Sequence, residues 1–377
     1  MNILYITHNV NLRSTTCVID AAIQNLPTDQ YSQMLVFPER GPWQTSLVAQ
    51  GIKVEIRPFL VPEKSRPIEF IRNVFYWVKL IKVNNVSIVH LNEHDNFPMI
   101  RHAAYLCRVP VIVGVRFVLE GGYAKWAFGG RDRPAKLLFT SQDQFNRSKG
   151  EIPANIPGSD TILFGNGRDL TQLTSVPCQR NATREIWNVT TGEVVLGTAS
   201  VIRRRKLLED FIALVRKLKN KGFAVKGIIA GGGKFADPAY LSELKQLIID
   251  SGLQDIVIMI GNIDDMAPFY QAIDIFVSTS ELETFGMSVC EAMAFAKPVI
   301  GYSGGSVAEV LDDASSIAKV RDVDALVEMA STLINDPELA QRKGEQAKVR
   351  AFSHFDAPML ASRLRTIYQQ VLRDYKK

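Results

Sequence analysis

Short apolar runs alternate with longer amphipathic segments along most of the chain. This alternation is typical of a parallel sheet whose strands are joined by crossover helices. In the first half the pattern becomes short and turn-rich between residues 140 and 167. Before that stretch it predicts a helix over 69–83 and strands over 3–7, 34–37, 54–56, 88–91 and 111–115.

The second half shows the same alternation more clearly. Apolar residues recur at three- and four-residue intervals over 206–218, which is the stripe of a helix lying on a sheet. Strands are predicted over 194–197, 225–230, 256–260, 274–278 and 299–301. Further helices are predicted over 239–249, 264–272, 288–296, 322–335, 337–351 and 357–374.

A polar stretch over 168–190 separates the two halves and lacks sustained periodicity, so we interpret it as an interdomain connection. At 377 residues the chain is long enough for two α/β domains, each with its own core. We expect one domain over 1–180 and another over 190–356. The final segment, 357–377, follows a break at 353–356.

Composition narrows the class of protein. The formal net charge is +5, but Lys and Arg are spread along the chain, which is unlike the concentrated basic face of a nucleic-acid binder. A solvated surface explains the excess, and an anionic small ligand or membrane surface is the alternative. The four cysteines have no metal-ligand spacing, so we expect a reducing, cytoplasmic location and no metal site. We see neither a signal peptide nor a membrane-spanning run.

Three glycine-containing turns follow predicted strands of the second half, at Gly231–Gly233, at Gly286 and at Gly304–Gly305. Ligands of open parallel sheets bind at the carboxyl ends of strands, where helix N-termini offer free N–H groups to anions. Three such turns in one domain therefore indicate a nucleotide diphosphate. The alternative is that each glycine merely ends its strand.

Two carboxylates bracket the N-terminus of the helix that follows the second turn. Glu283 lies in the loop, and Glu291 lies about one turn into the helix. Each can accept hydroxyl hydrogen bonds, so the pair can hold two polyols while the amides of Gly286, Met287 and Ser288 hold a phosphate. Alternatively, Glu283 interacts only with the helix dipole, and Glu291 is an exposed helix residue.

The segment 278–301 resembles the Glu-x7-Glu donor signature of retaining GT-B glycosyltransferases, the family that includes sucrose, glycogen and lipopolysaccharide glycosyltransferases. The resemblance is specific over roughly residues 160–375 and only topological before that. It implies two Rossmann-like, doubly wound domains facing a cleft, with the last helix packed back on the first domain. Supporting segments in the family's order are 164–167, 230–233, 260–261, 270–274 and 303–309.

The resemblance also implies roles for individual residues in donor binding. Glu283 would contact the donor sugar, and Glu291 would hold the ribose. The amides at 286–288 would approach the sugar and the diphosphate, and the base would lie near 261–264. Donor-binding residues would then also include Gly232 and Gly261.

The family neutralises the departing diphosphate with an Arg and a Lys five residues apart, without a metal. Lys206 matches the Lys, but Val201 stands at the Arg position. Arg203, Arg204 and Arg205 lie in the same loop, and we favour Arg203 as the second cation. The catalytic residues would be Lys206, Arg203 and Glu283, with Arg204 and Arg205 as donor-binding residues. A solvated basic loop is the alternative.

The acceptor side departs from the family. Thr7–Ser14 replaces a glycine pair after the first strand, and Arg116 stands where the family has a His. Glu69–Lys82 mixes aromatic residues with cations, which suits either a membrane surface or packing on the sheet. Polar residues at or near strand ends are candidates for the acceptor cleft or, alternatively, ordinary surface and core residues: His8, Asn11, Arg13, His90, Glu93, His94 and Arg116.

Together these features predict a retaining, metal-independent glycosyltransferase that moves a hexose-type sugar from a nucleotide-diphosphate sugar to a glycan or lipid-linked acceptor. Family frequency favours UDP over GDP as the nucleotide, and no further cofactor is implied. Its role would lie in polysaccharide or glycoconjugate synthesis, at the inner face of the membrane if the acceptor is lipid-linked. The alternatives are a nucleotide-sugar-binding homologue without transferase activity and a GT-B-fold nucleotide-sugar epimerase.

Overall fold

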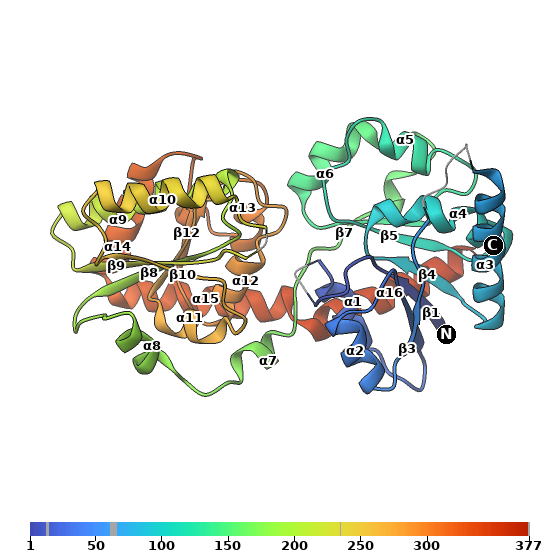
Figure 1. The fold of residues 1–377 in the computed structure, drawn as a ribbon, viewed down its shortest axis with the longest axis horizontal. Coiled ribbons are helices and arrows are strands. Elements are labelled where there is room, and N and C mark those ends of the chain that lie inside the picture. The colour runs from blue at the N-terminus through green and yellow to red at the C-terminus, as the bar shows by residue number, and fades with distance from the viewer. Residues whose placement is uncertain (13–14, 61–65, 234, 376–377) are drawn as a thin grey trace. The chain divides into compact units, whose positions relative to one another are not determined.

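The structure is a computed structural model that describes residues 1–12, 15–60, 66–233 and 235–375. The chain divides into two compact units (Figure 1). The first unit combines Met1–Asp169 with Ala357–Lys377, and the second is Leu170–Asp356. The expected first domain ends at residue 180, whereas segment 170–180 lies in the second unit.

The first unit is built on a seven-stranded parallel sheet of order β3-β2-β1-β4-β5-β6-β7. The chain starts in the middle of this sheet, builds one side, and then crosses to the other, so the order reverses between β1 and β4. The strands are β1 (Asn2–Ile6), β2 (Ser32–Phe37), β3 (Lys53–Ile56), β4 (Ile88–Leu91), β5 (Val111–Val115), β6 (Lys136–Phe139) and β7 (Thr161–Leu163).

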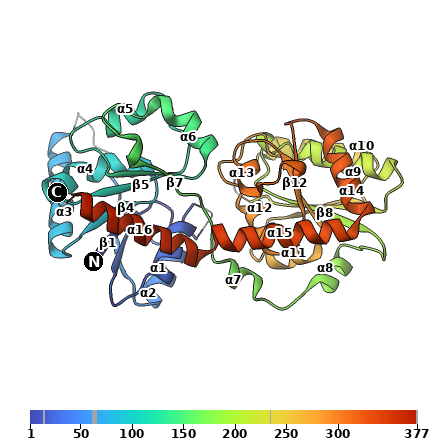
Figure 2. The ribbon, with the colours of Figure 1, turned by 180° about the vertical axis from the view of Figure 1, so that it is seen from behind.

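Helices cover both faces of this sheet. Because successive side chains of a strand point to opposite faces, Leu4 and Ile6 join one core while Ile3 and Tyr5 join the other. The helices α3 (Pro67–Val83), α4 (Phe97–Leu106) and α5 (Tyr123–Phe128) build the first core. The helices α1 (Cys17–Asn25), α2 (Pro42–Ala49) and α16 (Ala357–Tyr375) build the second core. The remaining α-helix in the described part of this unit is α6 (Gln142–Ser148). Figure 2 shows α16 beside α1, and the two helices are in contact.

The second unit has a six-stranded parallel sheet of order β10-β9-β8-β11-β12-β13. Its order also reverses beside the first strand, here between β8 and β11. The strands are β8 (Val194–Ala199), β9 (Val225–Ala230), β10 (Val257–Gly261), β11 (Ile275–Ser278), β12 (Val299–Tyr302) and β13 (Ile317–Ala318).

The helices of the second unit also divide between the two faces (Figure 1). One face carries α9 (Leu208–Asn220), α10 (Pro238–Asp250) and α14 (Val323–Asn335). The other carries α11 (Ala267–Ala272), α12 (Met287–Ala294) and α15 (Pro337–Phe355). The remaining helices are α7 (Leu170–Thr174), α8 (Arg180–Ile186) and α13 (Val307–Leu311).

The predicted α/β class and the ten predicted strands are confirmed, but β6, β7 and β13 were not predicted and two further interpretations need correction. The turn-rich stretch contains β7, and β6 precedes it. The three residues of β7 are too few to show a period. The polar connection contains the short helices α7 and α8. The helix expected from residue 206 begins at Leu208, because Leu207 adopts a left-handed conformation with φ 47°. In the described part of the chain, no helix combines the length and apolar character needed to cross a bilayer.

Candidate functional site

The loops after β8 and β11 meet where the strand order of the second unit reverses. Two hydrogen bonds join them: the Thr279 hydroxyl donates to the Lys206 carbonyl at 2.8 Å, and the Glu281 N–H donates to the Arg205 carbonyl at 2.8 Å. Open parallel sheets bind their ligands at this switch point, outside the carboxyl ends of the strands. The fold therefore brings the predicted donor residues to the expected edge.

Lys206 and Glu283 form an ion pair between these two loops, with Lys206 Nζ donating to Glu283 Oε2. Their side chains are only 11% and 20% exposed. An ion pair this far from bulk water is screened weakly, so each charge fixes the position of the other. The structure thus places two of the predicted catalytic residues in direct contact, although they lie far apart in sequence.

The backbone of Glu283 is held by the turn after β12. Glu283 N–H donates to the Gly304 carbonyl at 3.3 Å, and its own carbonyl accepts from Ser306 N–H at 2.9 Å and from the Ser306 hydroxyl at 3.0 Å. A Cβ on Gly304 would lie 2.1 Å from the Ser280 carbonyl oxygen. We expected this turn to approach a ligand. Its glycines instead make room for the loop that carries Glu283.

In the turn after β9, one glycine makes room for a neighbouring loop and another borders open space. A Cβ on Gly231 would lie 1.8 Å from the Ser200 carbonyl oxygen, so this glycine lets β9 approach the loop after β8. Gly231 N–H donates to the Gly261 carbonyl at 2.8 Å, which aligns the ends of β9 and β10. Gly232 and Gly261 have positive φ values of 150° and 74°, and a Cβ on either would meet no atom closer than 3.5 Å. Gly232 and Gly261, the two glycines expected to bind the donor, therefore border open space, whereas Gly231 does not.

The N-terminus of α12 begins beside Glu283. Gly286 adopts a left-handed conformation with φ 91°, and no side chain caps the helix. The amides of Met287 and Ser288 are thus in the first turn of a helix whose N-terminal dipole favours an anion. Glu291 is buried in the same helix and accepts a hydrogen bond of 2.9 Å from the Tyr270 hydroxyl, so the exposed-residue interpretation is wrong.

The three arginines before Lys206 have different environments. Arg203 Nε donates to the Phe235 carbonyl at 3.1 Å. Arg204 forms a two-bond ion pair with Glu243, at 2.6 and 2.9 Å, and this exposed pair raises the pKa of Arg204 through the hydrogen bonds. Arg205 makes no side-chain hydrogen bond or ion pair with any described residue, and its carbonyl binds the donor loop. Of the three, Arg205 therefore keeps its charge available beside Lys206.

In the first unit, a buried carboxylate occupies the switch point between β1 and β4. Glu93 is 1% exposed and accepts hydrogen bonds from the Thr7 hydroxyl at 2.9 Å and from Asn9 Nδ2 at 2.9 Å. The backbone N–H of His8 also donates to it, and His8 Nδ1 lies 3.6 Å from Asp95 Oδ2. This carboxylate orders the Thr7–Asn9 segment, where the family has glycines. Sequence reasoning named His8 and Glu93 but missed Asp95. It also missed Asn9, Asn92 and Asn96, whose side-chain amides all donate to Glu93 and which follow no recognisable spacing.

Two of the acceptor candidates are structural residues instead. His90 is fully buried and hydrogen-bonds the Tyr368 hydroxyl of α16 through Nδ1 at 2.6 Å; burial lowers its pKa to about 3. Arg116 is buried and donates to the carbonyl and side-chain oxygens of Asn92, at 3.1 and 2.9 Å. Burial lowers the pKa of Arg116 to about 10, although the Glu93 carboxylate opposes that shift.

The remaining acceptor candidates have mixed positions. His94 is largely buried against the Tyr123 ring, and burial lowers its pKa. Asn11 accepts a hydrogen bond from the Thr16 hydroxyl through its carbonyl, at 3.3 Å. Arg13 lies outside the described residues. Of the candidates near this edge, His8 is the exposed one whose side chain faces a carboxylate.

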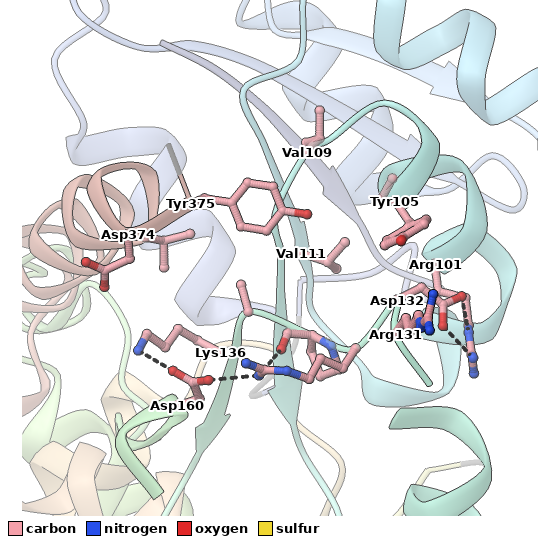
Figure 3. Close-up of a pocket in the computed structure, with 15 residues that line it drawn as sticks. Arg101, Tyr105, Val109, Val111, Arg131, Asp132, Lys136, Asp160, Asp374 and Tyr375 are labelled. Carbon is pink, nitrogen blue, oxygen red and sulfur yellow. Dashed lines mark hydrogen bonds and ion pairs between the residues drawn. The ribbon is translucent and has the colours of Figure 1, made fainter. Parts of the chain in front are cut away.

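A separate cavity of about 340 Å³ lies at the amino ends of β5 and β6 (Figure 3). This is the edge of the first sheet opposite to the one that carries His8 and Glu93. Its charged lining is mostly paired within itself. Lys136 and Arg133 both contact Asp160 at 2.8 Å, and Arg101 pairs with Asp132 at 2.7 Å. The paired charges connect neighbouring strands and helices of this unit, and none of the predicted site residues lines the cavity.

Comparison with known proteins shows similarity in fold over nearly the whole chain and a family match within the second unit. Residues 179–350 match the family described as glycosyl transferases group 1. N-acetyl-alpha-D-glucosaminyl L-malate synthase of Bacillus anthracis is 28% identical over 211 residues, which cover 55% of this chain and 51% of that relative. The chain thus spans about half the length of this curated relative.

Two further comparisons extend over nearly the whole chain. N,N'-diacetylbacillosaminyl-diphospho-undecaprenol alpha-1,3-N-acetylgalactosaminyltransferase of Campylobacter jejuni is 24% identical, over 93% of this chain and 91% of that protein. The crystal structure of HepE from Anabaena in complex with UDP has a TM-score of 0.83 at 18% identity, covering 98% of this chain and 100% of that one. At this identity the structural likeness establishes the GT-B fold. Residues 179–350, which lie in the second unit, thus match the group 1 glycosyltransferase family, and the chain as a whole has the GT-B fold.

Proposed function

We propose that this protein is a retaining, metal-independent glycosyltransferase that uses a nucleotide-diphosphate hexose as its donor. The observation that carries the proposal is the Lys206–Glu283 ion pair at the switch point of the second unit. It combines an ammonium group suited to a phosphate with a carboxylate suited to sugar hydroxyls. Beside it, the uncapped N-terminus of α12 offers free N–H groups to an anion.

The arrangement supports a division of labour along the donor. Glu291, which Tyr270 holds in place, would accept hydrogen bonds from the ribose hydroxyls. The amides of α12 and the Lys206 ammonium would bind the diphosphate. Glu283 would accept hydrogen bonds from the hexose. When the donor binds, it therefore has to break the Lys206–Glu283 ion pair or bind to both side chains while they stay paired.

The chemical step would be a front-face substitution at the anomeric carbon. The bond between that carbon and the diphosphate oxygen breaks, the acceptor oxygen bonds to the same face, and the acceptor proton passes to the departing phosphate. Positive groups fixed before the reaction stabilise the charge that develops on the phosphate. Lys206 and Arg205 supply these charges from the protein itself, and they lie next to each other in one turn.

UDP is the favoured nucleotide and a glycan or lipid-linked acceptor is the favoured co-substrate, with a role in polysaccharide or glycoconjugate synthesis. HepE, which shares the fold, has been crystallised with UDP and with UDP-glucose. The Campylobacter relative is named for transfer to a diphospho-undecaprenol acceptor. At the acceptor edge, the exposed His8 beside Asp95 is the group best placed to meet a sugar hydroxyl.

The Glu283→Gln variant tests the proposal most sharply. The neutral amide releases Lys206 for the phosphate but weakens recognition of the hexose. UDP should therefore bind at least as tightly as to the unchanged protein, measured by thermal shift, since a ligand that binds the folded state stabilises it. Transfer from the UDP-sugar should fall about 100-fold. The exposed Glu338→Ala variant on α15 serves as the matched control.

Three outcomes would count against this assignment. If neither UDP nor GDP stabilises the unchanged protein, the donor site is wrong. If nucleotides bind but neither a transfer product nor slow hydrolysis of the donor is detected, the chain is a binding homologue without transferase activity. If the anomeric configuration of the product is inverted when followed by NMR, or if the free sugar nucleotide is epimerised, the retaining mechanism is excluded.

A further inference from the structure

The outward face of α3 is apolar at its start and basic toward its end. Ile68 and Phe75 are 67% and 70% exposed, and Ile71 is also exposed. Positions three and four residues apart fall on one side of a helix. That spacing places three exposed cations on the same side, so the outward face of α3 consists of Ile68, Ile71, Arg72, Phe75, Lys79 and Lys82.

The outward face carries no acidic residue. Glu69 lies at the flank of the helix and is paired with Arg66 at 3.5 Å. Arg72, Lys79 and Lys82 form no ion pair with any residue in the described ranges. The exposed apolar side chains are thus accompanied by positive charge that is not neutralised locally.

The opposite side of α3 is fixed to the first unit, so the helix cannot turn to bury its outward face. Trp77 is fully buried, and its indole N–H donates to Asn73 Oδ1 at 3.1 Å. Asn73 Nδ2 in turn donates to the Met99 carbonyl of α4 at 3.0 Å. Leu80 and Ile81 complete the buried side. The exposure of the apolar residues is therefore a property of the folded unit.

We propose that the outward face of α3 docks on an anionic membrane surface. A helix lying in the interface inserts its apolar side chains at the boundary of the acyl chains, while its cations contact anionic headgroups. A second copy of the chain fits this surface poorly. In a twofold contact of α3 with itself, Arg72, Lys79 and Lys82 would face the same cations of the partner copy.

Docking of the outward face of α3 on a membrane goes beyond the proposed function and does not depend on donor binding. It names a contact that would hold the protein beside lipid-linked molecules, whether or not transfer takes place. The first residues of α3 belong to the carboxyl edge of the sheet, because crossover helices run antiparallel to the strands they connect. The proposed membrane contact thus begins at the edge that carries His8 and Glu93.

Flotation of the full chain with lipid vesicles tests the proposal. The protein should float with vesicles of phosphatidylcholine mixed with phosphatidylglycerol and stay behind with phosphatidylcholine alone. The double variants Ile71→Ser/Phe75→Ser and Lys79→Glu/Lys82→Glu should each weaken binding roughly tenfold or more. The substituted side chains are exposed, so thermal unfolding should stay unchanged.

A matched control is available on α15. Lys348→Glu/Val349→Ser changes one exposed cation and one exposed apolar residue in the second unit, and it should float like the unchanged protein. The proposal is overturned if the unchanged protein does not bind the anionic vesicles, or if both α3 variants bind them as well as it does. Equal loss in the α15 control would also overturn it, since attraction would then depend on total charge rather than on α3.

Discussion

At the scale of single residues, the arginines in the loop after β8 differ in their partners. Two of them bind other protein groups, and one is available to bind a ligand. Arg204 is bound to Glu243, and Arg203 donates to the Phe235 carbonyl. Arg205 is the residue that we now propose as the second positive charge beside Lys206. This replaces our preference for Arg203, because a guanidinium that already binds a fixed carbonyl is less free to follow a diphosphate.

Arg205→Ala should weaken UDP binding by about tenfold or more, which corresponds to the loss of one hydrogen-bonded charge. Arg204→Ala is the control, since its side chain has an exposed carboxylate partner away from the donor loop. Titration of UDP into each variant would give the affinities directly. Equal affinities for the unchanged protein and the Arg205 variant would remove Arg205 from the site.

His90 makes stability depend on pH. Burial holds its pKa at about 3 in the folded chain, so below about pH 6.5 the unfolded chain binds a proton that the folded chain does not. The contribution of His90 to stability is therefore complete above pH 6.5 and decreases as the pH falls toward 3, by up to about 1.4 kcal/mol per pH unit.

His90→Gln should flatten this dependence, because Gln carries no titratable group. The free energy of unfolding, measured by denaturant titration at about pH 7 and about pH 5, should fall less for the variant than for the unchanged protein. The variant is expected to be less stable at about pH 7, where the buried hydrogen bond to Tyr368 is altered. Parallel pH profiles would show that another group controls the acid sensitivity.

At the scale of elements, the second unit builds its site from loops that support one another. The turn after β12 holds the Glu283 backbone, and the loop after β8 is joined to the donor loop through its carbonyls. Gly304 and Gly305 allow the turn after β12 to approach the donor loop, since a Cβ on either would lie 2.1 Å from one of its carbonyl oxygens. The loops depend on backbone contacts, so a substitution that adds volume at a contact should disturb the site without touching a functional side chain.

Gly304→Ala should lower both stability and donor affinity. Its Cβ would lie 2.1 Å from the Ser280 carbonyl oxygen, so the donor loop has to move. We expect a loss of about 1–3 kcal/mol in the free energy of unfolding, with weaker UDP binding. Gly158→Ala provides the control, because no atom lies within 4 Å of the added Cβ. Undiminished UDP affinity in Gly304→Ala would show that the turn does not position Glu283.

At the scale of the whole molecule, each unit has its own sheet and its own cores on both faces. The chain passes between the units at 169–170 and again at 356–357. Asp356 connects these crossings, since its carboxylate accepts hydrogen bonds from Leu170 N–H at 2.9 Å and from the Thr171 hydroxyl at 3.3 Å. The predicted donor-binding residues all lie in the second unit.

Hydrogen exchange should therefore respond to UDP in one unit. Amides at the N-terminus of α12 and in the loop after β8 should exchange more slowly when UDP is bound, because they bind the diphosphate or lie beside it. Amides of β1 and β4 should be unaffected by UDP. Comparable protection in both units would mean that the nucleotide alone contacts residues of the first unit.

The sequence predicted the features that depend on local pattern. Alternating apolar runs predicted the two parallel sheets, and the resemblance of segment 278–301 to the family signature led us to predict donor binding there. The short strand β7 and the helices α7 and α8 were missed because each is too short to show a period. The sequence left His90 either as a candidate for the acceptor cleft or as a core residue, because its position at a strand end does not reveal which face it occupies.

The sequence by itself determined the fold class and pointed to segment 278–301 as the candidate donor site, since both depend on residues that lie near one another along the chain. Only the tertiary structure decided that Lys206 pairs with Glu283, that Gly304 serves the protein backbone, and that Glu291 is buried. These contacts join residues that are distant in sequence. They arise where strand order reverses and loops from separate strands converge, an arrangement that no local spacing encodes.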